Sequence, residues 1–199
     1  MRLLLISDVH CDLTAARSLA EQSTDADVLV CAGDLAVMRH GLQETVDVFS
    51  AIACPMVLVA GNGESDRELA AACTELANTH VLHGSGCEID GVAFWGLGGA
   101  VPITPFGAWS FDLSEREAES LLADAPENGV LVTHSPPLGH VDVAGRGEHL
   151  GSEAVRDAIE RTRPRIAVCG HIHACWEQES TIGTTRVINA GPKGIWAEV

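Results

Sequence analysis

Residues 166–173 read Ile166-Ala-Val-Cys-Gly-His-Ile-His173, a short apolar run that is followed by two histidines one residue apart. Successive side chains of a strand point to opposite faces, and a spacing of two residues does not bring side chains together on a helix. The histidines therefore fit a turn just after the carboxyl end of a buried strand. Open α/β sheets bind their ligands at this edge.

The same pattern of an apolar run and a polar residue occurs four more times along the chain. The runs cover residues 3–6, 28–32, 56–60 and 130–133, and the residues that follow them are Asp8 and His10, Asp34, Asn62, and His134. Aspartate, asparagine and histidine are ligands of hard and borderline metal ions. One such residue is ordinary in a loop, but five groups at the same edge of a sheet predict a metal site.

The composition limits the size of the protein and the kind of partner. A chain of 199 residues with 46% hydrophobic content is long enough for one well-filled core, and we expect a single domain over residues 1–199. The net charge is −16 and Lys193 is the only lysine, so we expect neither a long nucleic acid nor a membrane as partner. Composition leaves a homo-oligomer open.

The cysteines and the N-terminus predict a cytoplasmic protein. Seven cysteines are scattered without a Cys-x-x-Cys pair, which is typical of reduced thiols. The apolar residues 1–6 are too short for a secretion signal, and no later segment has the length of a membrane span.

The first half of the sequence predicts alternating strands and helices, hence parallel strands. We expect helices from Thr14 to about residue 22, over residues 42–53, and from Ser65 to about residue 77. Ser65 and Glu68 have the spacing of a capping box, as do Ser114 and Glu117 at the start of a later helix that ends near residue 123.

Antiparallel strands enter in the second half. Residues 81–82, 87–89 and 92–95 are short strand candidates, and Asp90-Gly91 is a hairpin signal between the last two. A helix over 152–162 precedes the strand at 166–169, and strands at 176–180 and 186–188 would pair across 181–183. Residues 97–113 form a long Gly/Pro/aromatic loop, which fits a pocket wall, a lid or an oligomer contact.

The loop after His134 is a second source of site residues. Pro136 and Pro137 stiffen its start, and it carries His140, Arg146 and His149 further along. We interpret these three as candidate substrate-binding residues, with Arg146 as a phosphate contact; the alternative is that they are solvated loop residues.

The set Asp8-x-His10, Gly33-Asp34, Gly61-Asn62-x-Glu64, His134 and Gly170-His171-x-His173 resembles the signature of the calcineurin-like metallophosphoesterases. Residues 133–140 and 188–191 are similar to the subgroup of small single-domain predicted phosphoesterases. The resemblance covers nearly the whole chain. It implies a four-layer α/β/β/α sandwich, an α/β fold with mixed sheets.

The resemblance also implies a ligand set for two divalent transition-metal ions. One ion would take Asp8, His10, Asp34 and His173, and the other Asp34, Asn62, His134 and His171, with Asp34 bridging. Asp34, Asn62 and His134 are the expected catalytic residues. Two such ions activate a water and stabilise both oxygens of an in-line displacement. The donor set suits manganese, iron, zinc or nickel, and of these we favour manganese.

Gly63 departs from the family pattern, in which histidine commonly follows the asparagine, contacts the phosphate and assists the leaving group. Gly61-Asn62-Gly63 also fits a tight turn with positive φ. We expect a hydrolase of small phosphodiesters or activated phosphomonoesters. The alternative is a metal-bearing protein-interaction scaffold with weak or vestigial activity.

Overall fold

The computed structural model describes residues 1–199 and contains two β-sheets. In the first sheet four parallel strands are joined by one antiparallel edge strand, in the order β11-β1-β2-β3-β4. The strands are β1 (Arg2–Ile6), β2 (Val28–Cys31), β3 (Met56–Leu58), β4 (Thr79–Val81) and β11 (Ile195–Glu198).

The second sheet has the order β5-β6-β7-β8-β10-β9, in which the four central strands are parallel and the two edge strands antiparallel. Its strands are β5 (Ser85–Ile89), β6 (Val92–Leu97), β7 (Val130–Thr133), β8 (Ile166–Cys169), β9 (Glu179–Ile182) and β10 (Thr185–Asn189). The Asp90-Gly91 hairpin between β5 and β6 is confirmed, with φ of 48° and 78° at its two residues.

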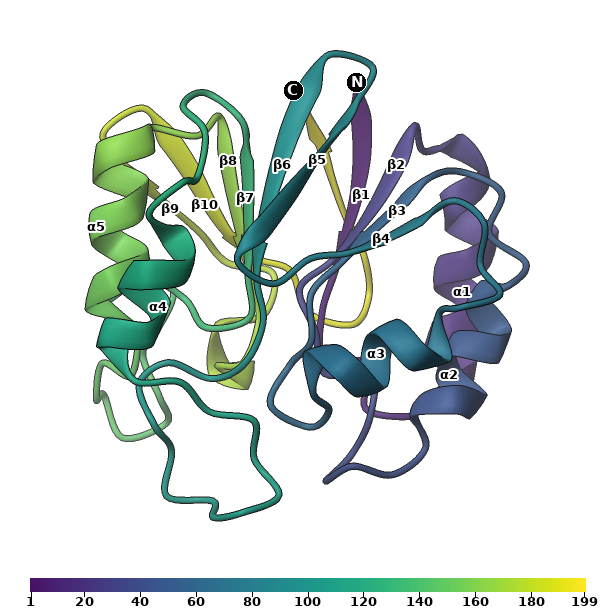
Figure 1. The fold of residues 1–199 in the computed structure, drawn as a ribbon, viewed down its shortest axis with the longest axis horizontal. Coiled ribbons are helices and arrows are strands. Elements are labelled where there is room, and N and C mark those ends of the chain that lie inside the picture. The colour runs from purple at the N-terminus through teal and green to yellow at the C-terminus, as the bar shows by residue number, and fades with distance from the viewer.

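Five helices cover the outer faces of the two sheets (Figure 1). The helices α1 (Leu13–Gln22), α2 (Leu42–Phe49) and α3 (Asp66–Ala72) lie on the first sheet, and α4 (Glu115–Leu122) and α5 (Glu153–Thr162) lie on the second. The short 3-10 helices η1 (Ser23–Asp25) and η2 (His173–Cys175) complete the set. The fold is thus the expected four-layer α/β/β/α sandwich.

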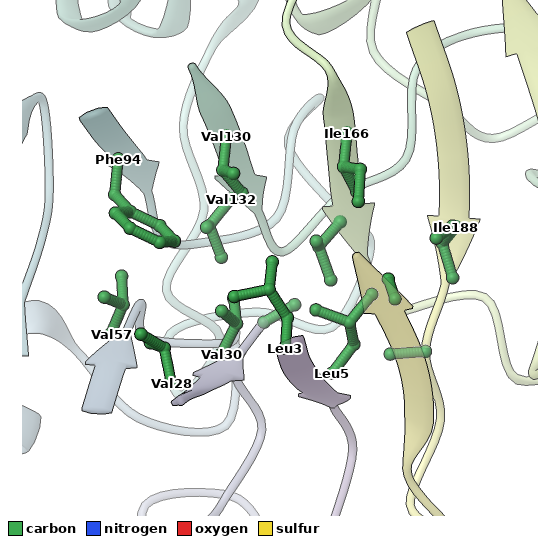
Figure 2. Packing of buried hydrophobic residues seen from close by; sticks show 14 of the residues in the cluster. Leu3, Leu5, Val28, Val30, Val57, Phe94, Val130, Val132, Ile166 and Ile188 are labelled. Carbon is green, nitrogen blue, oxygen red and sulfur yellow. The ribbon is translucent and has the colours of Figure 1, made fainter. Parts of the chain in front are cut away.

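The central core lies between the two sheets, where side chains from both inner faces interdigitate (Figure 2). Alternation along each strand decides which residues take part. Leu3 and Leu5 of β1 point into this core, whereas Leu4 and Ile6 pack against the helices. Because both faces of these strands are covered, the sequence shows continuous apolar runs instead of alternation.

Local polar groups set the helix ends, and one of these ends differs from expectation. The capping boxes at Ser65 and Ser114 are confirmed. The first helix, however, is capped by Asp12, whose Oδ1 accepts from the N–H groups of Thr14 and Ala15 at 2.9 and 3.0 Å. The predicted cap, Thr14, lies inside the helix. An aspartate placed before the first turn is the stronger cap.

Several elements are shorter or displaced relative to the sequence prediction; the strand predicted at 81–82, for example, is β4 at 79–81. The helices predicted over 42–53 and 65–77 end at Phe49 and Ala72, because the hydroxyls of Ser50 and Thr74 donate to carbonyls of the last turn. The strand predicted at 176–180 is β9 at 179–182, because η2 and a left-handed residue at Glu177 delay its start.

All parallel strands of both sheets end at the same edge, the lower one in Figure 1, where the connecting loops gather. One long connection joins β6 to α4 and hangs below this edge in the view of Figure 1. None of the helices is long and apolar enough to cross a bilayer.

Candidate metal centre

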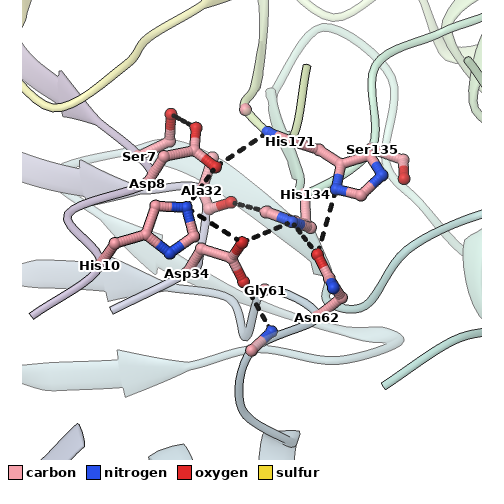
Figure 3. A network of polar contacts seen from close by, with 12 residues as sticks. Ser7, Asp8, His10, Ala32, Asp34, Gly61, Asn62, His134, Ser135 and His171 are labelled. Carbon is pink, nitrogen blue, oxygen red and sulfur yellow. Dashed lines mark hydrogen bonds and ion pairs between the residues drawn. The ribbon is translucent and has the colours of Figure 1, made fainter. Parts of the chain in front are cut away.

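The seven predicted ligand residues come together at this edge, each just after the carboxyl end of a strand, and Figure 3 labels all of them except His173. They are Asp8 and His10 after β1, Asp34 after β2, Asn62 after β3, His134 after β7, and His171 and His173 after β8. Two groups have ligand atoms within 4.8 Å of one another: Asp8, His10 and His173, and Asp8, Asp34 and His134.

Left-handed backbone aims several of these side chains. Asp8, His10, Asp34 and His171 have φ of 55°, 46°, 58° and 65°. Such a conformation costs a residue other than glycine about 1–3 kcal/mol and persists only where the surroundings enforce it. Here the N–H groups of Asp8 and His10 donate to the carbonyls of Gly33 and Asp34 at 2.9 Å each, which ties the loop after β1 to the loop after β2.

The two oxygens of Asp8 have different partners. Oδ2 accepts from the Ser7 hydroxyl at 2.6 Å and from the Trp176 indole at 3.0 Å. Oδ1 accepts from the His171 N–H at 3.1 Å and lies 3.9 and 3.8 Å from Nε2 of His10 and His173. Ser7 and Trp176 therefore hold the carboxylate so that Oδ1 faces the site. Neither Ser7 nor Trp176 belongs to a recognisable sequence motif, so the sequence alone did not identify their role.

Asp34 lies between the two halves of the site. Its Oδ1 accepts from the Gly63 N–H at 2.7 Å, while its Oδ2 is 3.5 Å from Nε2 of His10 and 3.6 Å from Nε2 of His134. Burial opposes ionisation, but His134 and His10 outweigh it and lower the pKa of Asp34. The ionised oxygen thus occupies the position expected of a bridging ligand.

Backbone carbonyls select the imidazole tautomers. Nδ1 of His134 is 2.8 Å from the Ala32 carbonyl and Nδ1 of His10 is 3.2 Å from the Ala36 carbonyl, so both Nδ1 atoms carry the proton and donate. A metal ion binds the neutral form of such a ring, in which Nε2 presents a lone pair to the site. Nε2 of His134 faces Asn62 Oδ1 at 3.2 Å, which is itself an acceptor.

Ring nitrogens of the histidines and the Asn62 amide oxygen converge on the site, and their contacts show whether a cation fits among them. Nε2 of His10 faces Nε2 of His173 at 3.1 Å, and Nδ1 of His171 faces Asn62 Oδ1 at 3.1 Å. Burial, followed by the charge of His134, lowers the pKa of His171 to about 3, which keeps that ring neutral. With its Nδ1 proton donated to Ala32, a neutral His134 ring directs an Nε2 lone pair at another acceptor, Asn62 Oδ1, and a divalent cation between the two satisfies both. The residues fit a metal.

The hydrogen bonds around Ser110 and Asp112 decide which atom of the Asn62 amide, nitrogen or oxygen, faces the histidines. The Ser110 hydroxyl donates to Asp112 Oδ1 at 2.5 Å, and the hydroxyl and N–H of Thr104 donate to Asp112 Oδ2 at 2.8 and 2.9 Å. With its proton on Asp112, Ser110 accepts from Asn62 Nδ2 at 3.0 Å. Asn62 Oδ1 is therefore directed at His134 and His171. The loop over 97–113 is a wall of the metal site, a role that its sequence left open.

Glu64 is a fully buried carboxylate that belongs to the same structure. Its oxygens accept from the N–H groups of Leu35, Ala36 and Gly61 at 3.2, 2.9 and 2.8 Å. Burial, with Asp34 as the second cause, raises the pKa of Glu64 to about 7. The side chain joins the loop that carries Asp34 to the loop that carries Asn62.

Gly63 requires a correction. Its φ is not positive, so the alternative of a left-handed turn at this residue is wrong. Glycine is needed here because of a close approach: a Cβ would lie 2.8 Å from the Ala36 carbonyl oxygen and 3.2 Å from Asp34 Oδ1. The Gly63 carbonyl also accepts from the Arg39 N–H at 2.7 Å.

A cavity of about 450 Å³ opens over the centre, and His10, Asp34, Asn62, His171 and His173 line it. The three predicted substrate contacts are not among the lining residues. His140 pairs with Ser180 of β9 at 2.7 Å, which ties the loop to the sheet, and His149 pairs with Asp142 of the same loop at 2.7 Å. Arg146 is exposed beside the lining residue Gly145. Their substrate-binding role stays a prediction that this arrangement of the loop does not favour.

An α/β/β/α sandwich with this donor set at its strand ends defines the class of metal-dependent phosphoesterases. A sequence model described as the calcineurin-like phosphoesterase superfamily domain matches residues 1–198, so the chain belongs to that superfamily. It is a metal-binding hydrolase of phosphoester bonds.

Individual relatives are similar over much of the chain. The UPF0046 protein K07C11.7 of Caenorhabditis elegans is 30% identical over 213 residues, which cover 96% of this chain and 69% of that protein. A cAMP/cGMP dual specificity phosphodiesterase of Mycobacterium tuberculosis is 29% identical over 154 residues, 74% of this chain and 48% of that protein. The chain thus spans about two thirds and about half of their lengths.

Solved structures support the fold. The protein TT1561 of Thermus thermophilus superimposes with a TM-score of 0.77 over 96% of this chain and 90% of that one, at 17% sequence identity.

Proposed function

We propose that the chain is a dinuclear phosphoesterase that hydrolyses small phosphodiesters or activated phosphomonoesters. The observation that carries this proposal is the position of Asp34 Oδ2, which lies 3.5 and 3.6 Å from Nε2 of His10 and His134. A carboxylate oxygen between two imidazoles, each with its own further donors, supports a pair of ions that share one ligand.

The chain's own residues divide into two binding sets. Asp8, His10 and His173 would hold one ion, Asn62, His134 and His171 the other, and Asp34 both. When bound, such ions polarise phosphoryl oxygens and lower the pKa of a water that serves as nucleophile. The carbonyls of Ala32 and Ala36 keep the imidazole lone pairs directed inward, and no protein nucleophile is required.

The donor set supports manganese among the transition metals that suit it. Asp8, Asp34 and Asn62 provide oxygen donors beside four imidazoles, a mixture in which oxygen suits manganese and nitrogen suits iron, zinc and nickel. The acidity of the chain, with a net charge of −16, supports a small phosphorylated substrate over a long nucleic acid. The scattered, unpaired cysteines support work in the cytoplasm.

The test begins with chelator-stripped protein that is reconstituted with Mn²⁺. We expect two ions per chain by elemental analysis and hydrolysis of bis(4-nitrophenyl) phosphate. His171→Ala should reduce the bound ions toward one and lower the rate to that of metal-free protein, whereas Ser120→Ala on the exposed face of α4 should change neither. Two bound ions without turnover of diesters or aryl monoesters would instead support the metal-bearing scaffold, which Gly63 favours.

A further inference from the structure

The wall of the cavity differs in chemistry from its floor. Above the polar floor the cavity is lined by apolar side chains, and neither lysine nor arginine lines it. The wall residues are Phe106, Trp109, Ala144, Leu150, Ile172 and Ala174. A substrate in this cavity would therefore meet cationic charge only at bound metal ions.

Two aromatic rings of this wall form a stacked pair that solvent reaches. The Phe106 and Trp109 rings lie 5.5 Å apart between centroids, at an interplanar angle of 13°. Phe106 is 50% exposed, and Leu150, on the loop between β7 and α5, is 45% exposed. Covering large exposed apolar groups with a ligand is favourable because it removes apolar surface from water, and flat rings stack well on aromatic faces.

Apolar exposure is concentrated around this cavity. The six exposed large hydrophobic residues all lie on three loops at the site edge: Val37, Met38, Ile103, Phe106, Val143 and Leu150. Of these, only Phe106 and Leu150 also line the cavity. Isolated exposed apolar residues need no explanation, but a set confined to one edge of the molecule marks a place of contact.

The arginine that contacts the aromatic pair is engaged elsewhere. Arg39 donates its Nε–H to the Trp109 carbonyl at 2.6 Å and forms an ion pair with Glu68. These contacts fix the backbone of the aromatic pair and use up the charge of the guanidinium group. A second anionic group on a substrate would find no lysine or arginine among the lining residues, in a chain of net charge −16.

We infer that Phe106, Trp109 and Leu150 form a subsite for a flat, uncharged aromatic substituent of the phosphoester. The inference rests on the proposed function and adds a substrate class to it: monoanionic phosphodiesters with one aromatic group on the oxygen that does not depart. A cavity of about 450 Å³ is of the size that small-molecule sites have.

The test uses a series of 4-nitrophenyl phosphodiesters that share the leaving group and differ in the second substituent: methyl, phenyl, 4-carboxyphenyl and octyl. Because the departing group is constant, differences in kcat/KM report on the subsite. For metal-loaded protein we expect phenyl to exceed methyl by about 10-fold or more, the size of one aromatic stacking contact. The 4-carboxyphenyl ester should lose most of this advantage, because its added charge has no partner.

Variants connect the preference to named side chains. Phe106→Ala and Trp109→Ala should each lower the phenyl-to-methyl ratio severalfold. Ile103→Ala is the matched control, because Ile103 is exposed on the same loop and does not line the cavity, and it should keep the ratio. Calorimetric binding of phenylphosphonate against methylphosphonate gives the same comparison without turnover.

The outcomes separate the inference from the function on which it rests. Hydrolysis of all esters with equal kcat/KM, unaffected by the two aromatic substitutions, overturns the subsite and leaves the phosphoesterase. An octyl ester that surpasses the phenyl ester overturns the aromatic class in favour of an apolar chain. If no ester reacts, the proposed function fails, and the phosphonate preference alone supports or overturns the subsite.

Discussion

Ser110 and Asp112 should control metal affinity although neither lies within reach of an ion. In Ser110→Ala, Asn62 Nδ2 loses its acceptor, and the amide no longer has a partner that distinguishes its nitrogen from its oxygen. One hydrogen bond contributes about 1 kcal/mol, and because about 1.4 kcal/mol is tenfold, the ion held by Asn62, His134 and His171 should bind about 5-fold more weakly.

Asp112→Asn should have a larger effect because it exchanges donor and acceptor in the hydrogen bonds that link Asp112, Ser110 and Asn62. The Thr104 N–H and hydroxyl both donate to Oδ2, so the new amide keeps its oxygen on that side and turns its NH₂ group to Ser110. Ser110 then directs its proton at Asn62 and favours the flipped amide, whose nitrogen cannot bind a metal. We expect a loss of about 10- to 100-fold, the range of substitutions behind metal ligands.

Competition with a chromophoric chelator for Mn²⁺ or Zn²⁺ measures both affinities. The affinity for the ion at Asp8, His10 and His173 and the melting temperature of the metal-free protein should stay near those of the natural chain. Ser120→Ala is the control. If Asp112→Asn weakens binding less than Ser110→Ala, or if both bind two ions normally, the proton count at Asn62 is wrong.

The geometry of the site supports three other predictions. Asp34→Ala should abolish binding of both ions while His10→Ala weakens one, as elemental analysis will report; loss of a single ion in both variants would contradict a shared Asp34. Gly63→His places a Cβ 2.8 Å from the Ala36 carbonyl oxygen, so denaturant titration should show a loss of about 1–3 kcal/mol, and a variant of unchanged stability would mean that this loop yields freely. All seven cysteines should be alkylated after unfolding without reductant, and any protected pair in the mass spectrum would reveal a disulfide.

The ligand set was predictable from sequence because a parallel sheet turns a linear pattern into a spatial one. Each apolar run ends in a ligand, and parallel strands bring these ends to one edge, so His134 and Asp8 meet although 126 positions separate them. Helix starts were predictable where a serine and a glutamate form a capping box, as at Ser65 and Ser114.

The partners that hold the ligands, the constraint on Gly63 and the contacts of His140 and His149 were not predictable, because they depend on contacts that local sequence does not encode. The hydrogen bond from Asn62 to Ser110 spans 48 positions, and that from Trp176 to Asp8 spans 168. Gly61-Asn62-Gly63 was also compatible with a left-handed turn because glycine permits one, yet the actual constraint on Gly63 is the approach of Ala36 from another loop. His140 and His149 were candidate substrate contacts by residue type, but Ser180 and Asp142 already occupy the Nδ1 atom of each ring.

Glu64 has a consequence for how the centre is assembled. By accepting N–H groups from two loops at 2.8 to 3.2 Å, it fixes the separation of Asp34 and Asn62 during folding, before any ion arrives. Metal binding then need not gather these ligands, and less conformational entropy is lost at that step. Glu64 accepts no hydrogen bond from the loops that carry Phe106 and Leu150. Substitutions of Phe106 and Leu150 themselves are free to alter what the cavity accepts while the spacing of the ligands, and with it the reaction, is preserved.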